Sequence, residues 1–189
     1  MGTVSQTCIN GWHEDTNTWA QHSSVSLVGG YGRKGRLQFS SLSGGQLITS
    51  LSFTFYKSDT NGSGTLRFYV TTDAGLLPSA YASAQYLGEM PQYGSGTGWK
   101  TLAVPSSMFE GLSQFTGTWY LILSDSISLT FNSYGTNACY FSGTYADGSM
   151  YYSDGGVMKI STPYTLDGGI MKPCTAYYSD GGVMKICIP

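Results

Sequence analysis

The chain has 189 residues and a formal net charge of −2, and only 11% of its residues are charged, well below the about 25% usual in soluble domains. With no basic run longer than the segment 33–36, this composition argues against a nucleic-acid-binding protein. No apolar run reaches the roughly 18 residues of a membrane span, so no membrane insertion is expected. The N-terminus lacks a basic region followed by an apolar one. We therefore expect synthesis in a cytoplasm without a signal peptide.

Strand patterns dominate the first three quarters of the chain. The segment 46–58 places Leu47, Thr49, Leu51, Phe53 and Phe55 on one face, the period-2 pattern of a half-buried strand. The segment 117–125 is almost continuously apolar, which indicates a central strand with its Trp119 in the core. Further strands are predicted over 23–29, 35–42, 64–73, 98–105, 128–132 and 138–145, and one turn of helix over 106–115.

Gly-, Asn- and Ser-rich turns separate these runs. About eight strands at this spacing, with little helix, predict an all-β fold: an antiparallel β-sandwich or jelly roll over residues 1–146. A closed barrel is the alternative architecture.

The most polar cluster, over residues 11–19, carries His13, Glu14 and Asp15, with His22 just beyond it. These side chains are of metal-ligand type, but they lack the helical spacing of a zinc motif. We interpret the segment as a solvated loop anchored by Trp12 and Trp19. No metal and no other cofactor is expected.

The carboxylates argue against an enzyme. Most of the eleven lie beside Gly, Asn or Ser in predicted turns, where an Asp side chain caps its own backbone. A glycosidase needs two carboxylates on rigid elements across a cleft, and no such pair is evident. No Ser-His-Asp set, phosphate-binding glycine loop or activated cysteine is evident either, so no catalytic residue is assigned.

Several aromatic residues have polar neighbours in the sequence. Exposed aromatic rings stack on sugar rings, while partial burial at strand ends is the alternative interpretation of each of these residues. The glycan-contact candidates are Trp12, Trp19, Tyr93, Trp99 and Tyr134.

Three 13-residue repeats end the chain, over 151–163, 164–176 and 177–189, and we take 147–189 as a separate unit. Each repeat predicts a β-hairpin, because Asp-Gly favours a type I′ turn. The turn residues are then Asp154, Gly155, Asp167, Gly168, Asp180 and Gly181. This register pairs Tyr151 with Met158, Tyr164 with Met171 and Tyr177 with Met184, the repeat-face contacts. A Gly-Gly turn would shift the register by one residue. Whether Cys174 and Cys187, at equivalent repeat positions, form a disulfide stays open.

Two resemblances add to this interpretation. The segments 35–73 and 98–125, with "ITSLSFTFY" and a strand led by Trp99, resemble jelly-roll domains of the carbohydrate-binding-module type. That likeness implies glycan binding or an inert scaffold. The repeats resemble the "Y-x-x-D-G-G-x-x-K-x-x-x-P" units that end many minor structural and tail proteins of bacteriophages. Those units usually carry Trp where this chain has Met158, Met171 and Met184.

Together these patterns predict a non-enzymatic structural protein of a bacteriophage virion, in a tail, baseplate or head-fibre. It would attach to the host surface or to neighbouring virion proteins. The expected partners are other virion proteins and a bacterial surface glycan, and a homotrimer is favoured by analogy with symmetric appendages. A free-standing carbohydrate-binding module is the alternative.

Overall fold

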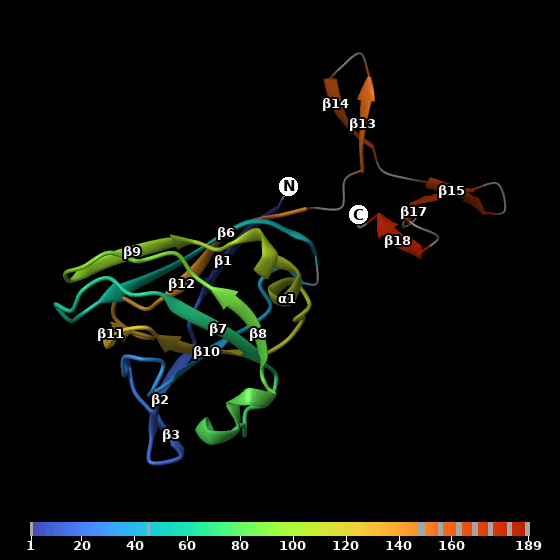
Figure 1. Cartoon of the computed structure of the whole chain (residues 1–189). Coiled ribbons are helices and arrows are strands. Elements are labelled where there is room, and N and C mark those ends of the chain that lie inside the picture. The colour runs from blue at the N-terminus through green and yellow to red at the C-terminus, as the bar shows by residue number, and fades with distance from the viewer. Residues whose placement is uncertain are drawn as a thin grey trace.

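Figure 1 shows the protein as a computed structural model. The structure describes residues 2–44 and 46–146, with all their side chains except that of Ser79. Beyond them it describes the backbone of six further strands, over 150–154, 157–161, 164–167, 170–173, 176–180 and 183–187. No helix in these residues is long and apolar enough to cross a membrane.

Residues 2–146 form two antiparallel sheets of six strands each, so the predicted all-β sandwich is confirmed. Sheet A has the order β1-β12-β6-β11-β4, and β9 also pairs with β6. Its strands are β1 (Gly2–Thr7), β4 (Ser24–Leu27), β6 (Ile48–Lys57), β9 (Gly98–Ala103), β11 (Leu129–Asn132) and β12 (Tyr140–Tyr145).

Sheet B has the order β3-β2-β5-β10-β7-β8. Its strands are β2 (Asn10–Asp15), β3 (Thr18–Gln21), β5 (Gly35–Phe39), β7 (Leu66–Thr71), β8 (Gln85–Glu89) and β10 (Trp119–Asp125). From β4 to β7, and again from β9 to β11, the chain alternates between the two sheets, so consecutive strands lie in opposite layers (Figure 1).

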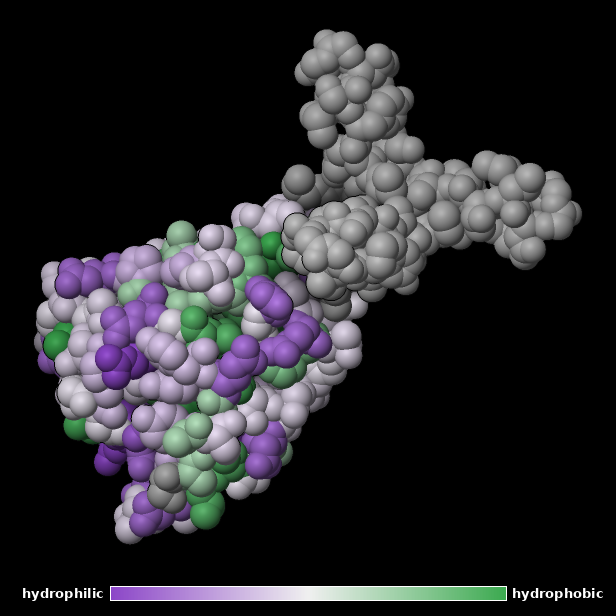
Figure 2. Space-filling view, turned by 45° about the vertical axis from the view of Figure 1, so that its right-hand side comes forward, coloured by the Kyte–Doolittle hydropathy of each residue, from purple (hydrophilic) through white to green (hydrophobic). Residues whose placement is uncertain are grey.

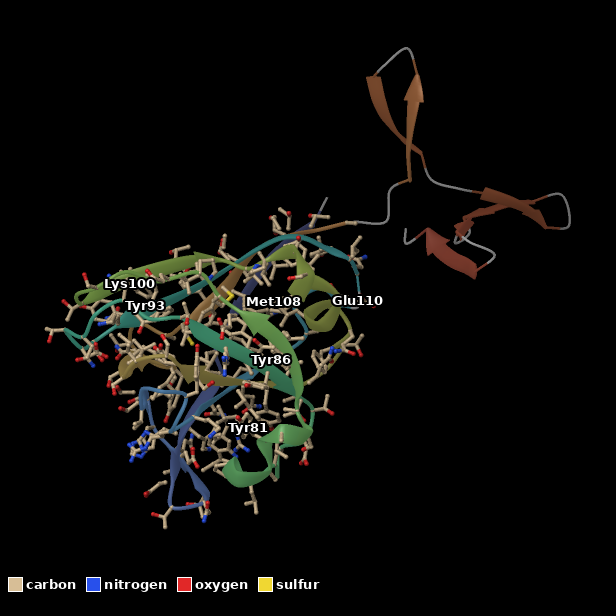
Figure 3. All side chains as sticks on the ribbon, in the orientation of Figure 1. Tyr81, Tyr86, Tyr93, Lys100, Met108 and Glu110 are labelled. Atoms are coloured by element: carbon tan, nitrogen blue, oxygen red, sulfur yellow. The ribbon has the colours of Figure 1, made fainter. Side chains whose placement is uncertain are left out.

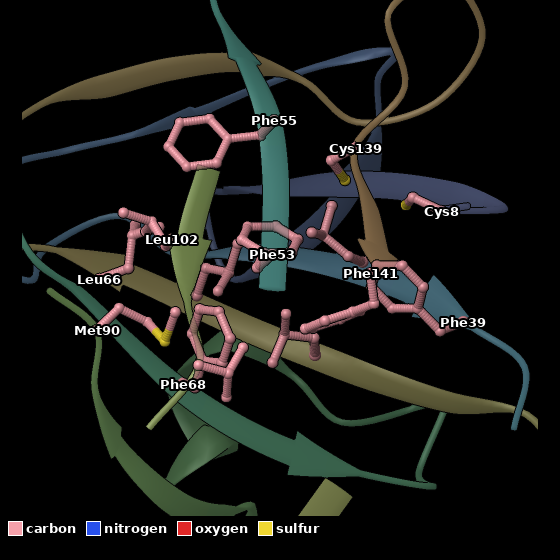
Figure 4. Close-up of a cluster of buried hydrophobic side chains, with 14 of the residues drawn as sticks. Cys8, Phe39, Phe53, Phe55, Leu66, Phe68, Met90, Leu102, Cys139 and Phe141 are labelled. Carbon is pink, nitrogen blue, oxygen red and sulfur yellow. The ribbon is translucent and has the colours of Figure 1, made fainter. Parts of the chain in front are cut away.

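The core lies between the sheets and is rich in aromatic rings (Figure 4). Phe53 of sheet A packs edge-on against Phe68 of sheet B at 5.5 Å between ring centroids. Trp119 stacks on Phe39 at 5.2 Å and is fully buried, which confirms its predicted place in the core. Strands β5 and β7 pair with the two edges of β10, and all seven of its residues are buried, which confirms the predicted central strand.

Strand β6 departs from the predicted alternation at its start. Ile48 and Leu51 are buried, while Leu47 and Thr49 are exposed. The pairing of β6 with β12 shifts between Thr144 and Tyr145, as in a β-bulge. A bulge adds one residue to a strand and changes which residues face the core. The predicted face is therefore right for Leu51, Phe53 and Phe55 and wrong for Leu47 and Thr49.

The polar segment 11–19 is a β-hairpin with a solvated tip, so the prediction of a loop over its whole length is wrong. Strands β2 and β3 pair Asp15 with Thr18. The two residues between them, Thr16 and Asn17, have φ of 41° and 65°. Positive φ at both central positions is the geometry of a type I′ turn, here built without the glycine that usually marks it.

The remaining elements of the sandwich are short. The predicted helical turn over 106–115 is present as a 3₁₀ turn, η2 (Ser106–Met108), followed by α1 (Phe109–Ser113). A second 3₁₀ turn, η1 (Pro78–Ser83), lies between β7 and β8. Strands β1 and β8 and the turn η1 were not predicted from the sequence.

The three repeats form three separate two-stranded sheets: β13 (Met150–Asp154) with β14 (Val157–Ser161), β15 (Tyr164–Asp167) with β16 (Ile170–Pro173), and β17 (Ala176–Asp180) with β18 (Val183–Cys187). Among the described residues, no strand of these hairpins pairs with the sandwich.

The hairpin register differs from the one predicted with an Asp-Gly turn. Asp154 pairs with Val157, Asp167 with Ile170 and Asp180 with Val183, so each Asp ends a strand. Tyr151, Tyr164 and Tyr177 therefore pair with Ile160, Pro173 and Ile186, not with Met158, Met171 and Met184. This is the one-residue shift of the Gly-Gly alternative. The predicted turn residues Gly155, Gly168 and Gly181, and the cysteine Cys174, lie outside the described residues.

Candidate functional site

Trp99 is half exposed, at 49%, on the outer face of sheet A. Strand pairing places it opposite Tyr56 of β6, and their rings meet edge-on at 5.6 Å between centroids. Tyr140 of β12, the strand beyond β6, lies with its ring centroid 6.2 Å from that of Trp99. Three aromatic side chains from three strands thus form one cluster, with the indole of Trp99 the most accessible.

The outward-facing residues of sheet A surround this cluster, and we call them together the Trp99 face. None is charged, and most carry a hydroxyl group. Their identities follow from the strand registers: Thr3, Ser5, Thr7, Ser24, Ser26, Ser50, Ser52, Thr54, Tyr56, Trp99, Thr101, Ala103, Thr130, Asn132, Tyr140, Ser142 and Thr144.

Neighbouring hydroxyl groups on this face hydrogen-bond across strands. Thr54 and Thr101 are joined at 3.1 Å between their Oγ1 atoms, and Ser26 Oγ lies 3.2 Å from Thr130 Oγ1. These pairs hold the side chains in place, and each hydroxyl keeps capacity for a further hydrogen bond. The Trp99 face is therefore an ordered, neutral surface that offers both donors and acceptors.

A hollow of about 530 Å³ continues the Trp99 face at its β1 edge. Thr3 and Ser5 belong to both the face and the hollow. The rest of its lining is the ring of Tyr145, the side chains of Gln6 and Gln46, and residues 42–44. Strands β6 and β12 lie between β9, which carries Trp99, and β1, which lines the hollow, so the distance across them is about 14 Å at the usual strand spacing.

Trp12 and Trp19 lie on the outer face of sheet B, where they enclose Arg36. The guanidinium carbon of Arg36 is 4.3 Å from the centroid of Trp12 and 5.1 Å from that of Trp19. Arg36 is only 6% exposed and donates to the carbonyl of Ala74 at 2.6 Å, and burial lowers its pKa. The rings of these two tryptophans stabilise a buried cation.

A connecting segment covers this part of sheet B. The indole N–H of Trp19 donates to the carbonyl of Leu76. Tyr81 of η1 packs edge-on against Tyr69 at 5.0 Å, and Tyr86 of β8 lies beside the same ring. Figure 3 shows Tyr81 and Tyr86 over this side of the molecule. Trp12 and Trp19 are thus partly buried packing residues, the alternative interpretation of their sequence context.

Tyr93 is buried, at 5% exposure, so its prediction as a glycan contact is wrong. Its hydroxyl donates to Oδ2 of Asp125 at 2.7 Å, and its ring packs edge-on against Phe55. Burial and the hydrogen bond to Asp125 raise the pKa of Tyr93 far above its ordinary value. Tyr134 is partly exposed in the connection between β11 and β12. The five predicted aromatic residues therefore do not form one site.

The structure adds Tyr56 and Tyr140 to Trp99, and sequence reasoning missed both. The alternation in "SFTFYK" already places Tyr56 on the face opposite to Phe55. Its contact with Trp99 depends on the pairing of β6 with β9, which joins residues 43 positions apart and has no local signal.

The acidic groups of the sandwich serve mostly structural roles. Asp59 accepts from Lys57, and Glu89 accepts from Arg67 at 2.6 Å. Asp125 is buried, which raises its pKa although Tyr93 and backbone N–H groups donate to it.

The two histidines of the sandwich stack on each other at 4.1 Å between the rings of His13 and His22. Burial and the neighbouring His22 lower the pKa of His13. Among the described residues, no group of three or more His, Cys, Asp or Glu side chains is arranged to hold a metal ion.

Comparison with known proteins gives no further assignment. Neither the models of protein families nor the curated proteins contain a match to this chain. The functional argument therefore depends on the surfaces described above.

Proposed function

We propose that this protein is a non-enzymatic attachment protein of a bacteriophage virion, whose sandwich binds a neutral bacterial surface glycan through the Trp99 face. The observation that carries the glycan part is the half-exposed indole of Trp99, framed by Tyr56 and Tyr140 on a surface without charge. The C–H faces of a pyranose ring pack on an indole, and its hydroxyls need neutral hydrogen-bonding groups nearby.

The absence of charge on the Trp99 face determines the kind of ligand. An anionic polymer such as a nucleic acid or an acidic glycan needs cationic side chains, and the Trp99 face has none. On the side of the sandwich that Figure 2 shows, hydrophobic residues lie in small, separate areas, unlike the broad apolar patch of an obligate protein interface. A neutral hydroxyl-rich ligand fits this chemistry best.

The virion part of the proposal rests on the repeats. An isolated two-stranded hairpin is marginally stable in water, and each described hairpin is its own sheet. Three such units gain stability by pairing with a neighbouring protein or with further copies of this chain. Repeated weak contacts of this kind add through multivalency, and a homotrimer would multiply them.

Binding of the full chain to bacterial cell walls and to a panel of neutral and acidic glycans tests the glycan part. We expect retention on neutral glycans only. Trp99→Ala should weaken binding at least about tenfold, the loss of roughly 1.4 kcal/mol of ring contact. Tyr86→Ala is the matched control, because Tyr86 is an equally exposed aromatic residue of the other sheet. Equal binding by wild type and Trp99→Ala would refute the assignment of the Trp99 face as the glycan-binding surface.

Deletion of residues 151–189 tests the virion part separately. We expect the shortened chain to keep its glycan binding, to lose its oligomeric mass in light scattering, and to fail to enter particles. Unchanged mass and unchanged incorporation would favour the free-standing carbohydrate-binding module. Turnover of a bound glycan by the wild-type chain would contradict the non-enzymatic part.

A further inference from the structure

Cys8 and Cys139 are two thiols that face each other across neighbouring strands of sheet A. Strands β1 and β12 are in register up to the pair Thr7 and Tyr140. One residue further, the N–H of Cys8 donates to the carbonyl of Cys139 at 2.9 Å. Both side chains point into the core, with exposures of 4% and 0%, and Figure 4 shows the thiols side by side at one end of it.

The backbone at this point suits a disulfide. Directly opposite residues of an antiparallel pair have Cα atoms about 4.5 to 5.5 Å apart, within the roughly 4.4 to 6.8 Å that disulfides span. Each thiol now donates to a nearby carbonyl, Cys8 to Asn10 at 3.1 Å and Cys139 to Ser133 at 3.3 Å. Thiols are weak hydrogen-bond donors, so losing these two hydrogen bonds opposes disulfide formation only slightly.

Burial in the core, with the neighbouring Cys8 thiol as a further cause, raises the pKa of Cys139. A buried thiol with a raised pKa reacts poorly with reagents from solution. The pair is therefore protected from random modification in the folded protein, and Cys8 becomes accessible when β1, an edge strand of sheet A, opens locally.

We propose that Cys8 and Cys139 are an oxidation site that closes into a disulfide joining β1 to β12. The oxidant is a small-molecule disulfide of the glutathione type. The Cys8 thiolate attacks one sulfur of the oxidant, forms a mixed disulfide and releases one thiolate. The Cys139 thiolate then attacks the Cys8 sulfur and releases the second. The two protons lost by the cysteines pass to the two released thiolates, so the oxidant is reduced to two thiols.

The bond would connect the first and last strands of the sandwich. A cross-link that spans nearly the whole domain removes much of the conformational freedom of the unfolded chain, and longer loops gain more. The thiols stay reduced in a cytosol and close in an oxidising medium. The same chain would thus fold without the cross-link in a cytosol and gain the cross-link once it is in an oxidising medium.

The first measurement compares the reduced and oxidised full-length wild-type protein. The wild-type chain is incubated with oxidised glutathione, its free thiols are alkylated in denaturant, and its peptides are mapped without reduction. We expect a cross-linked peptide containing Cys8 and Cys139. We also expect a thermal midpoint about 10 °C above that of the reduced protein, reversed by a reductant.

Cys8→Ala and Cys139→Ala should each abolish both the cross-linked peptide and the shift. Three results would overturn the proposal: Cys8 and Cys139 both alkylated after prolonged oxidation, Cys8 found capped by glutathione or joined to another cysteine, or the cross-link formed without a rise in thermal midpoint. Peptide mapping separates these results from any oxidation of Cys174 and Cys187, so the outcome is decided by Cys8 and Cys139 alone.

Discussion

The hydroxyl of Tyr93 donates a hydrogen bond of 2.7 Å to the carboxylate of Asp125, and both groups are buried between the sheets. Tyr93 lies in the connection between β8 and β9, and Asp125 ends β10. The bond thus fixes a connecting segment to the central strand of sheet B. Figure 3 shows Tyr93 close to Lys100, at the end of the sandwich where β9 begins.

Tyr93→Phe should therefore destabilise the protein. The substitution keeps the ring contact with Phe55 but leaves Oδ2 of the buried Asp125 carboxylate without the donor that Tyr93 provides. We expect the free energy of unfolding in urea to fall by about 1.5 to 3 kcal/mol, the usual effect of a hydrogen bond to a charged group. Tyr86→Phe, at an exposed position, should change it by less than about 0.5 kcal/mol. A loss no larger than this control would contradict the structural role of the bond.

The raised pKa of Tyr93 also predicts an alkaline limit to stability. In the unfolded chain the phenol ionises near pH 10, whereas in the folded protein it stays protonated to a higher pH. Above pH 10 the folded state then binds more protons than the unfolded state. The contribution of Tyr93 to the free energy of unfolding is therefore fully present below pH 10 and falls as pH rises, by up to about 1.4 kcal/mol per pH unit. Urea unfolding of wild type and Tyr93→Phe between pH 9 and 11 measures it. The difference between the two proteins should shrink with pH, and a constant difference would refute this assignment.

The buried side chain of Lys57 stabilises the connection between β6 and β7 through hydrogen bonds. Its side chain is completely buried, and its ammonium donates to the Asp59 carboxylate and to the carbonyls of Asp59 and Asn61, at 3.0 and 2.8 Å for the carbonyls. Lys57→Met keeps the length of the side chain but removes all three bonds. We expect a loss of about 3 to 5 kcal/mol in the free energy of unfolding, because the Asp59 carboxylate loses its cationic partner and keeps only the backbone N–H donors of Asn61 and Thr130. Lys100→Met, which removes one exposed bond to the carbonyl of Ser95, should lose less than about 1 kcal/mol.

Gly143 allows β12 to approach β6 closely. A Cβ atom at this position would lie 2.1 Å from the carbonyl oxygen of Ser50 and 2.8 Å from the Cα of Leu51. Both are backbone atoms, so neither can move aside without distorting β6. Gly143→Ala should lower the free energy of unfolding by about 1 to 3 kcal/mol or more. Gly117→Ala, where the added atom meets open space, should be nearly neutral. Equal thermal midpoints for the two variants would contradict this close approach.

A strand could be predicted where its own residues carry the pattern, and was missed or misplaced where they lack it or where its structure depends on pairing with a distant strand. Strand β10 was evident because its apolar run reports burial on both faces. The β2–β3 hairpin was missed because its strands are polar and its Thr-Asn turn lacks glycine. The start of β6 was assigned to the wrong face because the bulge arises from pairing with β12, and the sequence of β6 alone carries no trace of it.

The candidate site was less predictable than the fold. Trp99 was among the predicted glycan contacts, but so were Tyr93, which is buried against Asp125, and Trp12, which packs on Arg36. A polar neighbour in the sequence does not show whether an aromatic ring faces solvent, because alternate residues of a strand point to opposite faces. The neutrality of the Trp99 face emerges only when six strands are placed in register.

The register of β1 with β12 has a consequence for how the chain folds. Strand β12 is the last of the sandwich to be synthesised, yet it lies between β1 and β6 in sheet A. Gly2 pairs with Tyr145, so the two ends of the sandwich meet at one corner (Figure 1). A nascent chain that stops before residue 140 leaves β1 without its neighbour and exposes one edge of β6. We therefore expect a slow, all-at-once folding reaction dominated by pairings between distant residues, which begins only after the final sandwich strand has been made.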